Sequence, residues 1–175
     1  LIGAFSTGNE SGWKSVNIGF GYNKLNDFDR ITAIKSVNQT SSMLDQYVAD
    51  ANGGYMPNAT DLAIRTGLVY QINGEGDWMN DFAGSDYGQL QRHSVDESGA
   101  IGEYVFTTGA NYNDMIYIGG SVNVSSIRYR QQTTHEELEV PEDISYLNSF
   151  TYQQDLEISG SGVNFKGGVI LKPVS

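Results

Sequence analysis

The sequence predicts an all-β fold: an antiparallel up-and-down transmembrane β-barrel, present as an incomplete barrel wall, with long extracellular loops containing short helices. Apolar and polar residues alternate with a period of two over segments of roughly 11 to 15 residues, beyond the ~5 to 6 of ordinary strands. A tilted membrane strand needs about 9 to 11. The chain has 21 glycines and 11 tyrosines but only 3 prolines, a bias that fits long strands and not a helical bundle.

The strongest alternation lies in segment 102–130, which reads as one hairpin with a tight turn at Asn113 and Asp114. Its apolar face is expected to carry Tyr104, Phe106, Ala110, Tyr112, Ile116, Ile118, Val122 and Val124. Its other face is expected to carry Glu103, Thr107, Gly109, Asn111, Tyr117, Ser121, Asn123 and Ser125. Tyrosines near the ends of both arms are typical of an interfacial aromatic girdle.

Segment 13–25 repeats this pattern before the first long loop. Residues 1–7 are expected to end a strand and 8–12 to form a turn. In 13–25, one face holds Val16, Ile18, Phe20 and Tyr22, and the other holds Asn17, Gly19, Gly21 and Asn23. The segment is therefore predicted to be a second strand of the same two-faced kind.

Helical and irregular segments separate these strands. A serine cap, apolar residues at helical spacing and a following glycine predict a short helix within 41–54. Segment 58–68 fits either a second short helix or a strand, and 74–87 is expected to be irregular. The last strand is predicted from 150 to about 172.

These elements make a single partial β-barrel domain, 1–175, with 26–88 and 131–149 as long extracellular loops. Short turns lie at one end and long loops at the other, which is the layout of an outer-membrane barrel. About five strands are too few for a closed barrel. The sheet edges are therefore expected to attach to remaining barrel strands or to other protein.

Composition excludes several classes of protein. A net charge of -11, from 10 basic and 21 acidic residues, makes a nucleic-acid partner improbable because such binding depends on cationic contacts. The absence of cysteine excludes disulfides and thiolate chemistry. No apolar run is long enough for a transmembrane helix. The first residues lack a signal-peptide pattern, so we expect either a removed signal or, preferably, an internal piece.

No catalytic, metal or cofactor site is expected. His93 and His135 are far apart in sequence and are read as solvent-exposed. The glycines around Ser121 and Ser161 do not make a hydrolase motif. Two segments beginning at Asp50 and Asn73 lack the full acidic spacing of a calcium loop. The acidic run 136–143 is read as a solvated loop.

Four segments together resemble the FadL-type outer-membrane transporters of long-chain fatty acids and other hydrophobic compounds. They are "WKSVNIGFGYNKLNDFDR", "SSMLDQYVADANG", "SVDESGAIGEYVFTTGANYNDMIYIGGSVNV" and "SGSGVNFKGGVILKPV". The resemblance implies a channel for passive uptake, placed in the outer membrane of a Gram-negative bacterium, with the lipid bilayer as a partner. It also implies an N-terminal plug, which has no counterpart in these residues.

A hydrophobic small-molecule ligand is expected at an apolar patch on the loop helices. The candidate residues are Leu44, Tyr47, Val48, Leu62, Ile64 and Leu68, which could bury the chain of an amphiphile. Packing of the loop onto the barrel rim is the alternative for the same residues.

A soluble or surface-exposed all-β binding or adhesin module is the alternative for the whole chain. In such a module the apolar strand faces would meet a second sheet ~10 Å away instead of lipid.

Overall fold

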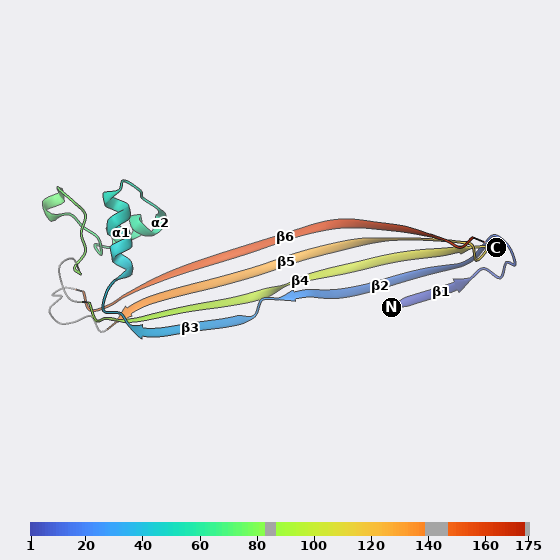
Figure 1. Cartoon of the computed structure of the whole chain (residues 1–175), viewed down its shortest axis with the longest axis horizontal. Helices are drawn as coiled ribbons and strands as arrows, with labels where there is room; N and C mark the ends of the chain where they lie inside the picture. The colour runs from blue at the N-terminus through green and yellow to red at the C-terminus, as the bar shows by residue number, and fades with distance from the viewer. Residues whose placement is uncertain (83–86, 139–146, 174–175) are drawn as a thin grey trace. The chain divides into compact units, whose positions relative to one another are not determined.

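The computed structural model describes residues 1–82, 87–138 and 147–173. They form mostly antiparallel sheet, so the predicted all-β class is confirmed. Figure 1 shows the strands, which are β1 (Ile2–Ser6), β2 (Trp13–Asp27), β3 (Arg30–Val37), β4 (Leu90–Tyr112), β5 (Ile116–Leu138) and β6 (Phe150–Leu171). The helices are α1 (Met43–Asn52), α2 (Asn58–Arg65) and the 3₁₀ turn η1 (Ile72–Gly74).

The strands form one sheet in the order β1-β2-β4-β5-β6, and β3 also pairs with β4. Most neighbours in the sheet are therefore neighbours along the chain, as expected for an up-and-down arrangement. In the described part of the chain the sheet is not closed: β1 and β6 end the strand order, and β3, which pairs only with β4 there, is also an edge strand.

The two expected loops contain strand residues. β3 lies inside 26–88, and β5 continues to Leu138 inside 131–149. The sequence "RITAIKSV" of β3 has only a weak alternation, and "RQQTTHEE" before the last residue of β5 is polar throughout. Both are extended because they belong to the sheet, and such pairing overrides a weak local pattern. Residues 139–146 lie outside the described part of the chain.

The turn between β4 and β5 is tight, as expected, and occupies 113–115. Asn113 and Asp114 have φ of 51° and 58°, a left-handed conformation that asparagine and aspartate tolerate better than most residues. The Met115 N–H donates to the Tyr112 carbonyl at 3.1 Å. The Asp114 N–H donates to the Asn111 side chain at 3.0 Å, which fixes the turn further.

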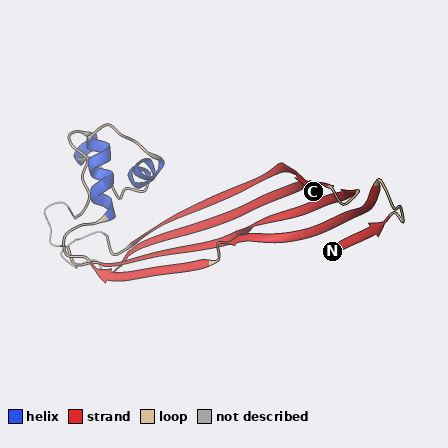
Figure 2. Ribbon diagram, turned by 45° about the vertical axis from the view of Figure 1, so that its right-hand side comes forward, coloured by secondary structure: helices blue, strands red, loops and turns tan. Residues whose placement is uncertain are grey.

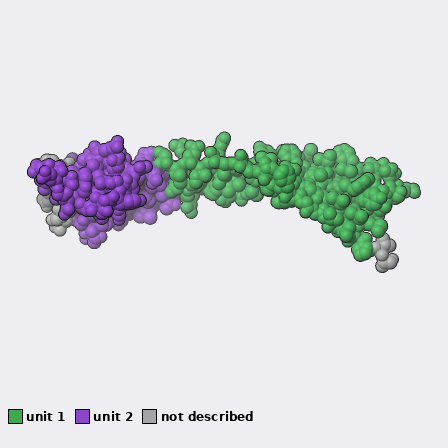
Figure 3. Space-filling view, turned by 90° about the horizontal axis from the view of Figure 1, so that it is seen from above, with its two compact units in different colours: residues 1–30, 96–131, 155–175 green, residues 31–95, 132–154 purple. Residues whose placement is uncertain are grey.

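Contacts divide the chain into two compact units, coloured separately in Figure 3. Unit 1 comprises 1–30, 96–131 and 155–175, and unit 2 comprises 31–95 and 132–154. Because β4, β5 and β6 each contribute residues to both units, this division does not test the expected single domain.

Unit 2 contains both helices, drawn in blue in Figure 2. The Ser42 side chain accepts from the Leu44 N–H at 3.1 Å, and Asp45 accepts from the Ser42 N–H at 2.8 Å. This capping box starts α1 where the serine cap predicted it. The ambiguous segment after Pro57 is also a helix, α2, although it has no side-chain cap.

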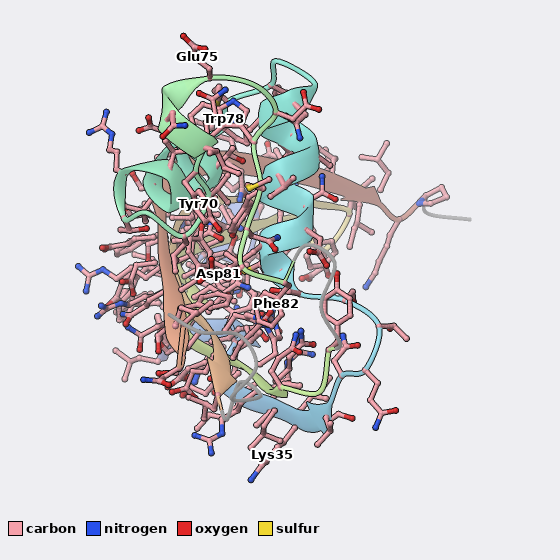
Figure 4. The ribbon with its side chains drawn as sticks, turned by 90° about the vertical axis from the view of Figure 1, so that its left-hand side faces the viewer. Lys35, Tyr70, Glu75, Trp78, Asp81 and Phe82 are labelled. Atoms are coloured by element: carbon pink, nitrogen blue, oxygen red, sulfur yellow. The ribbon has the colours of Figure 1, made fainter. Side chains whose placement is uncertain are left out.

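Hydrogen bonds stabilise the irregular segment that follows α2. Tyr70 Oη donates to Asp81 at 2.8 Å, and the Trp78 N–H donates to the side chain of Asn52 at 2.7 Å. Figure 4 labels Tyr70, Trp78, Asp81 and Phe82. Phe82 is fully buried in the hydrophobic cluster of unit 2, so this segment is anchored to the core at its end.

Candidate functional site

The sheet of unit 1 has two chemically different faces. The register places Val16, Phe20 and Tyr22 opposite Ala110, Phe106 and Tyr104. Residues directly opposite in an antiparallel pair share a face. The apolar residues of β2 and β4 therefore form one continuous surface, as their alternation predicted.

Aromatic pairs lie at both ends of this surface. Near the turns, Trp13 meets Tyr112 with ring centroids 5.2 Å apart, and toward the other end Tyr22 meets Tyr104 at 5.0 Å. Between them Phe20 contacts Phe106 at 5.0 Å. We call the apolar face between these aromatic pairs the belt: residues on that face within 13–22, 104–112, 116–124 and 163–171. These lengths match the about 9 to 11 residues of a membrane-spanning strand.

Large belt side chains are uncovered in the described residues. Ile18, Phe106 and Ile118 are 55%, 51% and 46% exposed, and Phe165 is 76% exposed. The described residues form one sheet, and no second sheet faces the belt among them. A soluble monomer rarely exposes a large contiguous apolar surface of this kind.

The opposite face of unit 1 carries a buried polar cluster. Glu103 is 8% exposed and accepts from Ser125 and Asn164, each at 3.2 Å. Asn123 is 1% exposed, and its better amide orientation accepts from Lys166 Nζ at 3.2 Å. A carboxylate and an ammonium thus both lie on this face, each beside amide groups that hydrogen-bond it.

A groove of about 540 Å³ adjoins this cluster. Its lining includes Asn17, Thr107, Asn111, Tyr117, Ser121 and Lys166, together with Gly109, Gly119 and Gly168. Small, hydroxylic and amide residues leave this face open, which suits a surface in contact with water, and Ile118, Val169 and Ile170 add apolar area to the same groove.

The candidate ligand residues of the loops lie in unit 2, and most of them are packed. Leu44 and Tyr47 belong to the buried cluster with Ala63, Val69, Phe82 and Phe150. Val48, Ile64 and Leu68 pack against that cluster, whereas Leu62 is 49% exposed. Leu44 and Tyr47 therefore form part of a core instead of an open patch. Burial raises the pKa of Tyr47 to about 12, aided by the nearby Tyr152, Asp50 and Glu137.

Glu137 is the functional group that the sequence did not identify. The acidic run 136–143 predicts a solvated loop, but the side chain of Glu137 is fully buried at the end of β5. Its carboxylate accepts from Ser42 Oγ at 2.8 Å and from the Met43 N–H at 2.7 Å. It also accepts from Gln89 and Gln91, each at 3.0 Å, and contacts His135 Nε2 at 3.1 Å.

This network ties the start of α1 to the sheet strands of unit 2. Ser42 is the N-cap of α1 and Met43 its first residue, so the carboxylate also lies at the positive end of the helix. Burial, the largest effect, would raise the pKa of Glu137. The hydrogen bonds from His135, Met43, Ser42 and Gln89 together outweigh it and lower that pKa below its ordinary value.

Unit 2 is therefore expected to lose stability in acid. A lowered folded pKa means that the contribution of Glu137 is complete above its ordinary value of 4.5 and lost as the pH falls through the lower folded value. The Trp78 fluorescence of a Trp13→Phe variant, measured during urea unfolding between pH 7 and pH 3, checks this. A midpoint that stays constant below pH 4.5 would contradict the assignment.

The two histidines lie together in unit 2, so the solvent-exposed reading is wrong for His135. Their ring centroids are 5.9 Å apart, and the His135 side chain is 12% exposed. His135 also lies near Phe150, at 6.4 Å between centroids. Among the described residues, no group of three or more His, Asp or Glu side chains is arranged to hold a metal ion.

In the part of the chain that the structure describes, no helix is both long and apolar enough to span a membrane. No family model matches the chain, and no similar curated protein or solved structure is found.

Proposed function

We propose that this chain forms part of the wall of an outer-membrane β-barrel channel in a Gram-negative envelope, which takes up hydrophobic compounds passively. The observation that carries the proposal is the belt, an exposed apolar face that the register makes continuous across β2 and β4 and that has an aromatic pair at each of its ends. Lipid-facing surfaces of barrels have this combination of apolar band and aromatic girdles.

The polar face is assigned to the barrel lumen in this proposal. Its buried Glu103 and Asn123 and its glycine-lined groove are compatible with water, and they would be costly against lipid. Apolar residues on one face and polar ones on the other are required on every strand of a water-filled barrel.

The solute class is the part of the proposal that depends on the resemblance to the FadL-type transporters. Long-chain fatty acids are the compounds that this resemblance implies. The packed cluster around Leu44 and Tyr47 supports a folded loop structure in unit 2. Leu62, which is half exposed on α2, is the member of the candidate patch most available to a ligand.

The open sheet supports a wall that is completed by further strands. The edge strands would leave backbone N–H and C=O groups unpaired, and lipid offers them no hydrogen bonds. In the proposal, β1 and β6 pair with the remaining barrel strands or with other protein.

Trp13 provides a direct test because it lies in the aromatic pair nearest the turns. In a Trp78→Phe variant, Trp13 emission is expected to shift to shorter wavelength on addition of lipid vesicles. It should also be quenched by lipids brominated high in the acyl chains, since interfacial tryptophans lie at that depth.

The matched control is Trp13→Phe, which leaves Trp78 in unit 2 as the reporter. Its emission is expected to be insensitive to brominated lipid. A soluble binding or adhesin module predicts instead that neither tryptophan is quenched, and that result would contradict the membrane assignment.

A further inference from the structure

Two hollows follow one another on the belt face of unit 1. The first has a volume of about 550 Å³, and its apolar lining includes Ile18, Phe20, Phe106, Val122 and Phe165. Gly120 also lines it and contributes no side chain that would fill the space. This apolar hollow is therefore open to whatever contacts the belt.

The second hollow, of about 740 Å³, lies beyond the Tyr22 and Tyr104 pair. Tyr22 borders it, and a Cβ at Gly102 would lie only 2.8 Å from the Tyr22 ring. Glycine at 102 is thus needed for the tyrosine ring to lie there. We call the two spaces the apolar hollow and the polar hollow.

The polar hollow contains cationic and hydroxyl donors. Lys24, Arg128, Ser126, Ser159 and Ser161 line it. Arg128 is exposed and has no ion-pair partner among the described residues, whereas Lys24 pairs with Asp27.

The one carboxylate that lines the polar hollow already accepts a hydrogen bond. Asp29 accepts from the backbone N–H of Gly99 at 3.0 Å. The Arg128 guanidinium, which lies among serine hydroxyls, is therefore the main group in the polar hollow that could bind an anion. It favours an anion with several oxygens.

We propose that the two hollows form one binding site for a membrane lipid with a phosphate headgroup. The acyl chain lies in the apolar hollow, and the phosphate receives hydrogen bonds from Arg128 and the serine hydroxyls. This inference rests on the proposed function, because the belt face must contact lipid. The polar hollow then lies just beyond the aromatic pair, at the depth of the headgroups.

Charge complementarity favours a lipid whose phosphate gives it a net negative charge over a neutral or zwitterionic lipid. A guanidinium can bind two phosphate oxygens at once, and this pairing is stronger near a bilayer surface than in bulk water. The adjoining apolar hollow explains why a free phosphate is not the expected occupant. Burial of acyl methylenes adds to the affinity, at about 0.8 kcal/mol for each CH₂.

Native mass spectrometry of the detergent-solubilised chain tests which headgroup the site prefers. Dioleoyl phosphatidic acid is expected to bind more tightly than dioleoyl phosphatidylcholine. Arg128→Gln should weaken its binding about tenfold, as expected for loss of one charged hydrogen-bonding group. The matched control is Arg130→Gln, an exposed arginine that already pairs with Asp155 at 3.7 Å, and it should change the affinity less than about twofold.

Filling the apolar hollow with a larger side chain tests whether the hollow holds the acyl chain. Val122→Trp should weaken binding of dioleoyl phosphatidic acid but not of the dihexanoyl form. Ile116→Trp, on the same strand face but lining neither hollow, is the control and should affect neither.

Three results would contradict the proposed lipid-binding site. They are equal binding of the two dioleoyl lipids, equal losses in the two arginine variants, and displacement by glycerol 3-phosphate at the concentration of the lipid. If the wild-type chain inserts into vesicles and shows any of these, the site fails and the proposed function stands. If the chain is monomeric and stays in solution without detergent, both fail.

Discussion

Ile118→Arg is expected to destabilise insertion of the chain into lipid vesicles by about 2 to 4 kcal/mol, the cost of an arginine on the lipid face near the bilayer centre. Ile118 lies in the belt and is 46% exposed. An arginine there would place a charge in hydrocarbon with no partner. A folding titration in urea, with preformed vesicles, measures the difference from the wild-type chain.

Ser121→Arg is the matched control, because Ser121 follows Ile118 by three residues on β5 and side chains alternate between the two faces of a strand. Its arginine would enter water if that face is the lumen, and the cost should be much smaller. Equal costs for the two variants would show that the faces are wrongly assigned. A larger cost for Ser121→Arg would reverse them.

Glu137→Gln is expected to lower the free energy of unfolding of unit 2 by about 3 kcal/mol. The carboxylate accepts four hydrogen bonds from Ser42, Met43, Gln89 and Gln91. A glutamine has the same shape, but one of its terminal groups is a donor and would face other donors. Charged, buried hydrogen bonds contribute more than neutral ones, and a buried unsatisfied group costs about 1 to 3 kcal/mol.

The control for Glu137→Gln is the neighbouring Glu136→Gln. Glu136 makes one ion pair with the exposed Arg92 at 3.1 Å, and such pairs contribute about 0 to 1 kcal/mol. Urea unfolding of both variants in the Trp13→Phe background reports on unit 2 through Trp78. Similar midpoints for the two variants would refute the structural role of Glu137.

The two-faced strands of unit 1 could be predicted from local pattern because their alternation is strict. Apolar side chains recur at every second residue from Val16 to Tyr22 in β2 and, except at Gly120, from Ile116 to Val124 in β5, so pairing in one register puts them on a common face. The tight turn at Asn113 and the helix capped by Ser42 were likewise predictable. Each depends on residues close together in the chain.

β3 and the polar end of β5 could not be predicted in this way. Their residues have no strong alternation and become strands through pairing with neighbours. Whether segment 58–68 formed a helix was also undecided, because its apolar spacing fits both structures. Its buried Thr60 and Ala63 settle it, as they pack on one side of α2 in unit 2.

The role of Glu137 was decided by tertiary structure alone. In the sequence it belongs to an acidic run, and like charges at adjacent positions indicate a solvated segment. Its donors Ser42 and Gln89 lie 95 and 48 residues away along the chain. The local sequence shows that Glu137 is charged, but it does not show whether the carboxylate is buried. Burial requires hydrogen-bond donors from distant parts of the chain, and these come together only in the folded protein.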